Sequence, residues 1–302
     1  MTKAPHAFPY QGSKRNLASA ILPYLPDDTN CFIEPFAGSA AMSIAALVNN
    51  KAKTLAVGDL NKPLIELWYA IVNSPGNLSD QYHHLWLAQF ESDEGAYYER
   101  IRSLFNQDFK PEHFLYLLAR CVKAAVRYNS HGKFNQSRDK RRSGMKPQSM
   151  RENIYEVSSL LSGKTQFFSC DYKETLQRAK SDDLVYMDPP YQGTSKKYDK
   201  RYLEGLNYDE FVSSLEVLNS SSIPFLVSYD GRTGDKQHGR LLPDHLCLEH
   251  IELHAGRSAQ ATLLGRNAET YESLYLSASL VEKISYTKRS QAQPVQSLLL
   301  RV

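Results

Sequence analysis

Near its beginning the chain reads CFIEPFAGSA at residues 31–40. The extended apolar run of this segment ends in a tight turn at Gly38, and Met42, Ile44 and Leu47 follow with helical spacing. We therefore predict a strand, a tight turn and a helix in succession. This is how an α/β domain with a parallel sheet begins.

A second strand is predicted at Thr54–Val57, and it stops at Gly58-Asp59. In βαβ units that bind dinucleotides, an acidic residue follows the first glycine turn by about 20 residues and binds a ribose. Asp59 lies at this distance from the turn at Gly38, so we expect its carboxylate to face a ribose.

The α/β pattern is interrupted after the second strand and resumes later in the chain. Apolar residues recur with helical spacing in Leu64–Val72, Tyr82–Phe90, Ala96–Phe105 and Glu112–Val126. Strand patterns return at Thr165–Ser169, Leu184–Met187 and Phe225–Ser228, with a helical pattern near Asp209–Asn219. The predicted fold class is α/β. We expect a doubly wound, Rossmann-like domain at 1–62 and 165–302, with an inserted, mainly α-helical domain at 63–164.

The third predicted strand runs into the sequence LVYMDPPY at residues 184–191. Open parallel sheets bind ligands beyond the carboxyl ends of their strands, so Asp188 is expected in a pocket. Pro189 and Pro190 lack a backbone N–H and stiffen the loop. Asp188 and the Pro189 carbonyl are therefore two acceptors that one amino group can bind through both of its hydrogens.

This pair of acceptors suits methylation of an exocyclic amine on a nucleobase. The lone pair of such a nitrogen is delocalised into the ring, and two aimed acceptors oppose that delocalisation and stabilise the positive charge that develops during attack. Asp188 also lies where the released proton must go. Tyr191 offers an aromatic face on which a base extruded from its duplex can stack.

Three segments resemble motifs of the Dam-type, alpha-group DNA adenine-N6 methyltransferases, namely Tyr10–Lys14, Glu34–Ala40 and Asp188–Tyr191. Their order also matches that family, in which an amino-terminal motif precedes the glycine turn and a target-recognition domain precedes the DPPY strand. The resemblance covers most of the chain. It implies methyl transfer from S-adenosylmethionine to adenine N6 of a flipped base in double-stranded DNA.

The resemblance also assigns residues to roles. The implied catalytic residues are Asp188, Pro189, Pro190 and Tyr191. The implied cofactor-binding residues are Tyr10, Lys14, Glu34, Phe36, Ala37, Gly38, Asp59, Asp171 and Asp188. Asp188 would contact the cofactor and the target base together, and Asp171 would lie near the cofactor adenine.

The chain departs from the family pattern at one position, where Ala40 replaces a second glycine. If this position requires a positive φ, the alanine is strained there. We therefore expect the turn to form but its detailed geometry to differ from the usual glycine loop.

Residues 127–135, RYNSHGKFN, resemble a segment that family members place beside DNA, and a basic loop follows directly. We expect this loop, Lys133–Lys146, to be mobile and to contact phosphates. The predicted DNA-binding residues are Arg127, Tyr128, Asn129, Lys133, Asn135, Lys140, Arg141 and Arg142. In this prediction Tyr128 wedges between bases. The alternative makes Tyr128 and Phe134 packing residues under a charged loop.

Composition sets the remaining expectations. The 302-residue chain has 42% hydrophobic and 23% charged residues, which excludes wholesale disorder. Its longest nearly apolar stretch, Ala40–Val48, is far shorter than the roughly 20 residues that span a bilayer. We expect a cytoplasmic protein of a prokaryote or phage, without membrane contact.

No metal site is expected from the cysteines or histidines. The four cysteines lie far apart without CxxC spacing, which favours neither a disulfide framework nor a cysteine zinc site. His250 and His254 have HxxxH spacing but lie in a segment with an extended pattern, and no glutamate follows the first histidine.

The sequence leaves three functions in competition. Adenine-N6 methylation of DNA is favoured, and cytosine-N4 methylation is its nearest rival because that acceptor is also an exocyclic amine. RNA and protein-glutamine methylation are disfavoured, since those enzymes more often resemble an Asn-Pro-Pro-Tyr pattern. A catalytically silent DNA-binding protein of the same fold is the third. We expect a monomer or weak dimer, with a cognate restriction endonuclease as a further candidate partner.

Overall fold

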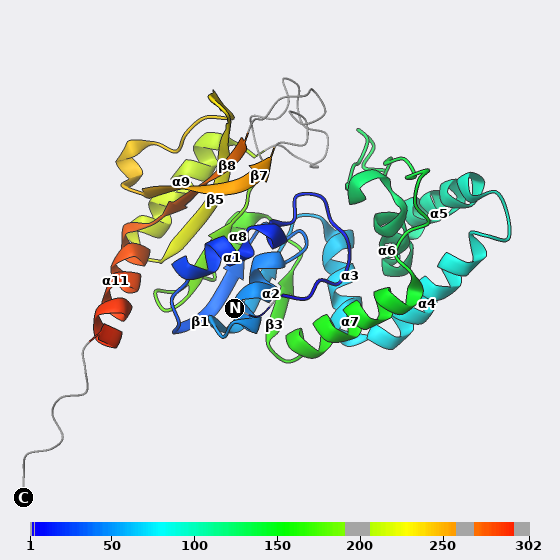
Figure 1. Ribbon diagram of the computed structural model, residues 1–302, viewed down its shortest axis with the longest axis horizontal. Helices are drawn as coiled ribbons and strands as arrows, with labels where there is room; N and C mark the ends of the chain where they lie inside the picture. The colour runs from blue at the N-terminus through cyan, green and yellow to red at the C-terminus, as the bar shows by residue number, and fades with distance from the viewer. Residues whose placement is uncertain (1, 3, 191–205, 258–268, 293–302) are drawn as a thin grey trace, which may run out of the picture.

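The fold is an α/β structure built on one mainly parallel sheet (Figure 1). The computed structural model describes residues 2, 4–190, 206–257 and 269–292. The strands are β1 (Thr29–Glu34), β2 (Ala52–Gly58), β3 (Thr165–Phe168), β4 (Leu184–Met187), β5 (Phe225–Thr233), β6 (Lys236–Gln237), β7 (Glu249–Arg257) and β8 (Glu269–Leu276). Their order is β3-β2-β1-β4-β5-β8-β7, with β6 paired to β5.

Strands β1 to β5 pair in parallel, and β6, β7 and β8 add antiparallel pairs. The chain runs outward from β1 through β2 to β3, and then returns to the other side of β1 to form β4. The strand order therefore reverses between β1 and β4. This confirms the predicted α/β class, and it creates a crevice at the carboxyl ends of these two strands.

Both faces of the sheet are buried, as expected for parallel strands. On β4, Leu184 and Tyr186 belong to the core on one face, whereas Val185 and Met187 belong to the core on the other. This alternation follows from the two-residue period of a strand. It explains why a continuous apolar run, rather than an alternating one, marks β4 in the sequence.

Helices cover the two faces. The first face carries α1 (Ala18–Ile21), α2 (Ala41–Val48), α3 (Lys62–Asn73) and α11 (Ala278–Ala292), and the second carries α8 (Tyr172–Leu176) and α9 (Tyr208–Ser220). Short 3-10 turns are η1 (Lys14–Asn16), η2 (Leu22–Tyr24), η3 (Val122–Ala124) and η4 (Asp244–Leu246). Among the residues described, no helix is both long and apolar enough to cross a membrane.

The inserted helical region extends beyond the edge of the sheet (Figure 1). Its helices are α4 (Pro75–Ala88), α5 (Glu94–Asp108), α6 (Pro111–Arg120) and α7 (Pro147–Leu161). We predicted that helix α6 continues to Val126, but it ends at Arg120. Cys121 is extended, and Lys123 and Ala124 have φ angles of 59° and 51°, which lie outside the helical region.

Helix α3 packs against the sheet, although the predicted boundary at residue 63 placed it in the inserted domain. The Trp68 ring stacks on Phe167 of β3 with centroids 6.1 Å apart, and its indole N–H donates to the Gly38 carbonyl at 3.0 Å. The Tyr69 hydroxyl donates to the Phe167 carbonyl at 3.1 Å. Helical spacing identifies α3 but does not say which layer it joins, and the boundary at residue 63 stays a prediction.

The end of β2 packs closely against α8, and this contact generates a test of the fold. A Cβ at Gly58 would lie 2.5 Å from Oγ1 and 3.1 Å from Cγ2 of Thr175. We expect Gly58→Ala to lower the free energy of unfolding by about 1–3 kcal/mol, because neither the strand nor the buried threonine has room to move. Urea denaturation measures the loss.

Removal of the Thr175 atoms provides the control. In a Thr175→Ala background, we expect Gly58→Ala to lower the free energy of unfolding by at most half as much as in wild type, because the overlapping atoms are gone. Strictly additive losses of the two single variants would show that the overlap with Thr175 is not the cause.

Candidate functional site

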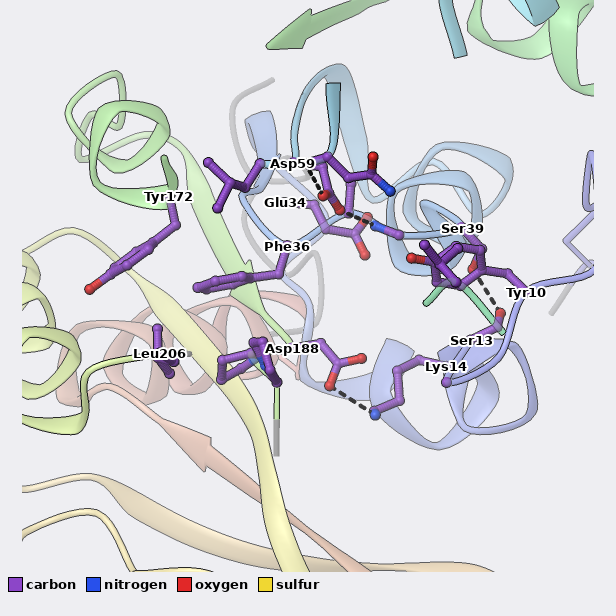
Figure 2. A pocket seen from close by; sticks show the side chains of 18 of the residues that line it. Tyr10, Ser13, Lys14, Glu34, Phe36, Ser39, Asp59, Tyr172, Asp188 and Leu206 are labelled. Carbon is purple, nitrogen blue, oxygen red and sulfur yellow. Dashed lines mark hydrogen bonds and ion pairs between the residues drawn. The ribbon is translucent and has the colours of Figure 1, made fainter. Parts of the chain in front are cut away.

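A cavity of about 430 Å³ opens at the carboxyl ends of β1 and β4. It lies where the strand order reverses, the position at which open α/β sheets bind ligands. Figure 2 shows its lining from close by. All nine residues predicted to bind the cofactor line it, together with Pro189 and Pro190: Tyr10, Lys14, Glu34, Phe36, Ala37, Gly38, Asp59, Asp171 and Asp188. Tyr191, the last predicted catalytic residue, lies outside the described residues.

The turn after β1 is built from two left-handed residues. Gly38 has φ +48°, and a Cβ there would lie 3.0 Å from Cε1 of Tyr10. Ala40 has φ 48° and ψ 34°, and its N–H donates to the Ala37 carbonyl at 2.6 Å. Ala40 therefore adopts the strained conformation foreseen from the sequence, at a cost of roughly 1–2 kcal/mol.

Asp59 holds this turn in place. Its Oδ2 accepts a hydrogen bond from the Gly38 N–H at 3.0 Å, and its Oδ1 accepts one from the Asn61 N–H at 2.9 Å. Burial raises the pKa of Asp59, and these two N–H donors act in the opposite direction. The carboxylate thus joins the turn after β2 to the turn after β1, and it also borders the cavity in which a ribose contact is predicted.

Asp188 is held by an ion pair across the cavity floor. Its Oδ1 lies 2.8 Å from Nζ of Lys14, which also lies 3.3 Å from Oε2 of Glu272 on β8. Figure 2 shows Lys14 directed at Asp188 from the turn that follows Ser13. Burial by itself lowers the pKa of Lys14, but the two carboxylates more than offset this, and the net shift is upward. Lys14 is therefore a buried cation.

Glu34, the last residue of β1, is a buried carboxyl group at the centre of the site. Its Oε2 accepts hydrogen bonds from the Ser43 hydroxyl at 2.5 Å and from the Ser43 N–H at 2.9 Å. Burial raises the pKa of Glu34 to about 8, and the nearby charge of Asp188 adds to the increase. Glu34 is consequently protonated at neutral pH.

The opposite wall of the cavity is aromatic. Phe36 stacks on Tyr172 with centroids 5.0 Å apart and an interplanar angle of 27°. Asp171 caps α8 by accepting the Lys173 N–H at 2.9 Å. Sequence reasoning missed Tyr172, although it directly follows the predicted Asp171. It also missed Leu206, Asn207 and Glu210, which line the same wall.

The predicted DNA-binding segment lies beside the cavity, and most of its charged residues are exposed. Exposed side chains are Arg127, Lys133, Asn135, Lys140, Arg141 and Arg142. Asn129 is half-buried, and its Oδ1 accepts from the N–H groups of His131 and Lys133 at 2.9 and 3.0 Å. Their contact with DNA stays a prediction.

Tyr128 requires a correction. It is buried, its hydroxyl donates to Oδ1 of Asn61 at 3.0 Å, and its ring packs edge-on against Phe134. Burial raises the pKa of Tyr128 above its ordinary value. Its ring faces the interior and the cavity, so the wedge prediction is wrong for this conformation and the packing alternative describes it.

The basic loop was predicted to be mobile, but it is anchored. The buried Arg120 donates to the Asp139 carbonyl at 3.5 Å and to the Arg142 carbonyl. It also pairs with Glu94 at 2.6 Å. Asp139 in turn accepts the Arg141 N–H at 2.9 Å and pairs with the Arg142 guanidinium at 2.7 Å. Loop composition gave no sign of Arg120, which lies in the preceding helix.

The raised pKa of Glu34 generates a prediction about stability. An unfolded glutamate loses its proton near pH 4.5, whereas Glu34 keeps it up to about pH 8. Between these values the folded state binds one more proton than the unfolded state, so this group makes stability fall as pH rises. Glu34→Gln removes that effect. We expect its unfolding free energy to rise relative to wild type by about 1.4 kcal/mol per pH unit from roughly pH 5 to 7.5.

Urea denaturation of the ligand-free protein at several pH values measures this difference. Glu66→Gln, an exposed position on α3, is the matched control and is expected to track wild type. A Glu34→Gln difference that does not change with pH would contradict the assignment of a protonated Glu34.

The chain matches a family model and several known proteins in sequence. The family model described as D12 class N6 adenine-specific DNA methyltransferase matches residues 10–285. Relatives include the Retron Ec67 DNA adenine methylase of Escherichia coli, 28% identical over 264 residues, covering 84% of this chain and 87% of the relative. A DNA adenine methylase of Vibrio cholerae is 25% identical over 267 residues, covering 85% and 91%.

A third relative is the Type II methyltransferase M.CviBI of Paramecium bursaria Chlorella virus NC1A, 27% identical over 194 residues, covering 63% of this chain and 70% of the relative. The matched region of the family model begins at Tyr10, at the edge of the cavity, and extends beyond Glu272. It therefore includes every described element that contributes to the cavity. The chain belongs to the D12 class N6 adenine-specific DNA methyltransferase family.

Proposed function

We propose that this protein transfers the methyl group of S-adenosylmethionine to N6 of an adenine that is flipped out of duplex DNA into the cavity beside Asp188. Adenine-N6 methylation of DNA is the activity of its family. The observation that carries the residue assignment is Asp188, held by Lys14 at 2.8 Å on the floor of the cavity at the strand-order reversal.

The residues around the cavity fit S-adenosylmethionine. When bound, this cofactor supplies a methyl group on a positively charged sulfur. The cavity volume of about 430 Å³ lies within the range of small-molecule sites. Asp188, which lines the cavity, is a carboxylate that suits a cationic ligand. Phe36 would contact its apolar parts, and Asp59 its ribose.

Asp188 would bind the target amine while it stays paired with Lys14. A carboxylate offers about four acceptor positions, so one ion pair does not exhaust it. The Pro189 carbonyl would accept the second amine hydrogen. Together they would stabilise positive charge on the nitrogen as it attacks, and Asp188 would lie next to the proton that is lost afterwards.

DNA would bind along the exposed basic segment. Lys140 and Arg141 are exposed cations on an anchored loop, and the anchoring by Arg120 reduces the ordering cost of phosphate binding. Arg127 and Asn129 lie nearer the cavity end of this segment and are the candidates to contact base edges. A cognate restriction endonuclease stays a proposal, as does the cytoplasmic location that this substrate and cofactor imply.

The first test concerns Asp188. We expect Asp188→Ala to lower kcat/KM for DNA methylation by about 10³-fold or more, since the removed acceptor acts on charge that develops in the transition state. Asp182→Ala, an exposed aspartate just before the amino end of the same strand, is the matched control and is expected to keep wild-type activity.

The assay uses labelled S-adenosylmethionine and mixed-sequence duplex DNA, followed by digestion to nucleosides. N6-methyladenine supports the proposal. Label only in N4-methylcytosine would select the rival function, and label only in RNA would overturn the substrate. Folded, cofactor-binding wild-type protein that leaves all DNA unmethylated would favour the silent DNA-binding alternative.

The second test concerns the basic loop. We expect the Lys140→Ala/Arg141→Ala variant to bind duplex DNA at least tenfold more weakly at about 0.1 M salt, with the slope of log affinity against log salt reduced by about 1–2. Lys164→Ala, an exposed lysine in the turn before β3, is the control. An unchanged salt slope would place phosphate binding elsewhere.

A further inference from the structure

Glu272 occupies a position on β8 that strand geometry assigns to the apolar face. Leu274 and Leu276 share this face of β8 and belong to the hydrophobic core. Leu253, the residue paired with Glu272 on β7, belongs to the same core. A glutamate in this row loses part of its hydration, and its exposed fraction is only 21%. The position calls for a polar partner, and Lys14 contacts it at 3.3 Å.

The backbone around Glu272 is also unusual. Strand β5 has a bulge between Tyr229 and Arg232, opposite the part of β8 that contains Glu272. Gly231 lies in this bulge, where a Cβ would overlap the Tyr271 carbonyl and lie 2.8 Å from Cα of Glu272. Bulges next to active sites aim side chains in directions that a regular ladder does not allow. The close approach at Gly231 thus fixes the backbone from which Glu272 reaches Lys14.

The charges of Lys14, Asp188 and Glu272 give Glu272 a role beyond packing. A lysine side chain is long and flexible. If Asp188 were its sole carboxylate partner, the lysine charge would neutralise the carboxylate that must accept a hydrogen bond from the amine. Glu272 is a second carboxylate, 3.3 Å from the same ammonium, and it shares the charge of Lys14 with Asp188. The Asp188 carboxylate is then less neutralised where positive charge develops on the attacking nitrogen.

We infer that Glu272 is a positioning residue for methyl transfer: it holds Lys14 against Asp188 and balances the ammonium charge, so that Asp188 stays oriented and electron-rich toward the amine. This inference rests on the proposed function, because it concerns the methyl-transfer step. Glu272 acts through Lys14 and does not itself need to contact the base.

A double-mutant cycle separates this role from a merely structural one. We expect Glu272→Gln to slow single-turnover methylation by about 10–100-fold at saturating cofactor and DNA. If Glu272 acts through Lys14, the same substitution in a Lys14→Met background should change the rate by less than about threefold. Glu269→Gln is the control, since Glu269 is exposed on the same strand and accepts from the Tyr271 hydroxyl.

The outcomes are distinct. Equal rate losses in the wild-type and Lys14→Met backgrounds, or a Glu272→Gln rate within twofold of wild type, would overturn the inference. If wild type and Glu269→Gln both fail to methylate DNA, the proposed function fails instead, and the inference with it. If Glu272→Gln does not fold, Glu272→Asp is put through the same cycle, because it keeps the charge but withdraws it from Lys14.

Discussion

The ion pair between Lys14 and Asp188 is the interaction on which the rest of the site depends. Burying an ammonium costs several kcal/mol, and that cost is met here by two carboxylates rather than one. The pair fixes the segment after Tyr10 across the carboxyl end of β4. That same segment donates from the Gln11 N–H to the Ala124 carbonyl at 3.0 Å, so the acid of the DPPY sequence, the cofactor cavity and the inserted region are joined through a few residues.

Three non-glycine residues near this junction have a positive φ. Ala40 lies beside the cavity in a left-handed conformation, and Lys123 and Ala124 adopt left-handed angles in succession where the inserted region meets the Gln11 turn. Non-glycine residues persist in such conformations only when their surroundings determine them. The methyl group of Ala40 is fully buried, and the Ala124 carbonyl has a defined donor. Both sites thus use tertiary contacts to keep geometry that glycine would adopt without strain.

Features that follow from local residue patterns and strand order were predicted from the sequence. Features that depend on residues distant in the chain were missed. The apolar run before Asp188 and the glycine turn after β1 predicted a site at the carboxyl edge of the sheet, because parallel strands end at the same edge. The family resemblance then supplied the nine residues that line the cavity there. Glu272 was missed because it lies on an antiparallel strand far from Lys14 and Asp188 in the sequence, and nothing in its local pattern distinguishes it from Glu269 on the same strand. The early end of helix α6 was missed for a similar reason, since Lys123 and Ala124 are good helix formers.

The position of Tyr128 is the most informative, because its burial fits the packing alternative rather than a wedge between bases. Its hydroxyl bonds to Asn61, and Asn61 donates its N–H to Asp59, which in turn holds the Gly38 turn. Tyr128 therefore belongs to the wall of the cavity, while its neighbours Arg127 and Asn129 are exposed and half-buried. Any movement of this segment toward DNA has to carry the Tyr128–Asn61 bond along or break it. Hydrogen bonds thus connect Tyr128 of this segment to the Gly38 turn on the other side of Asn61 and Asp59.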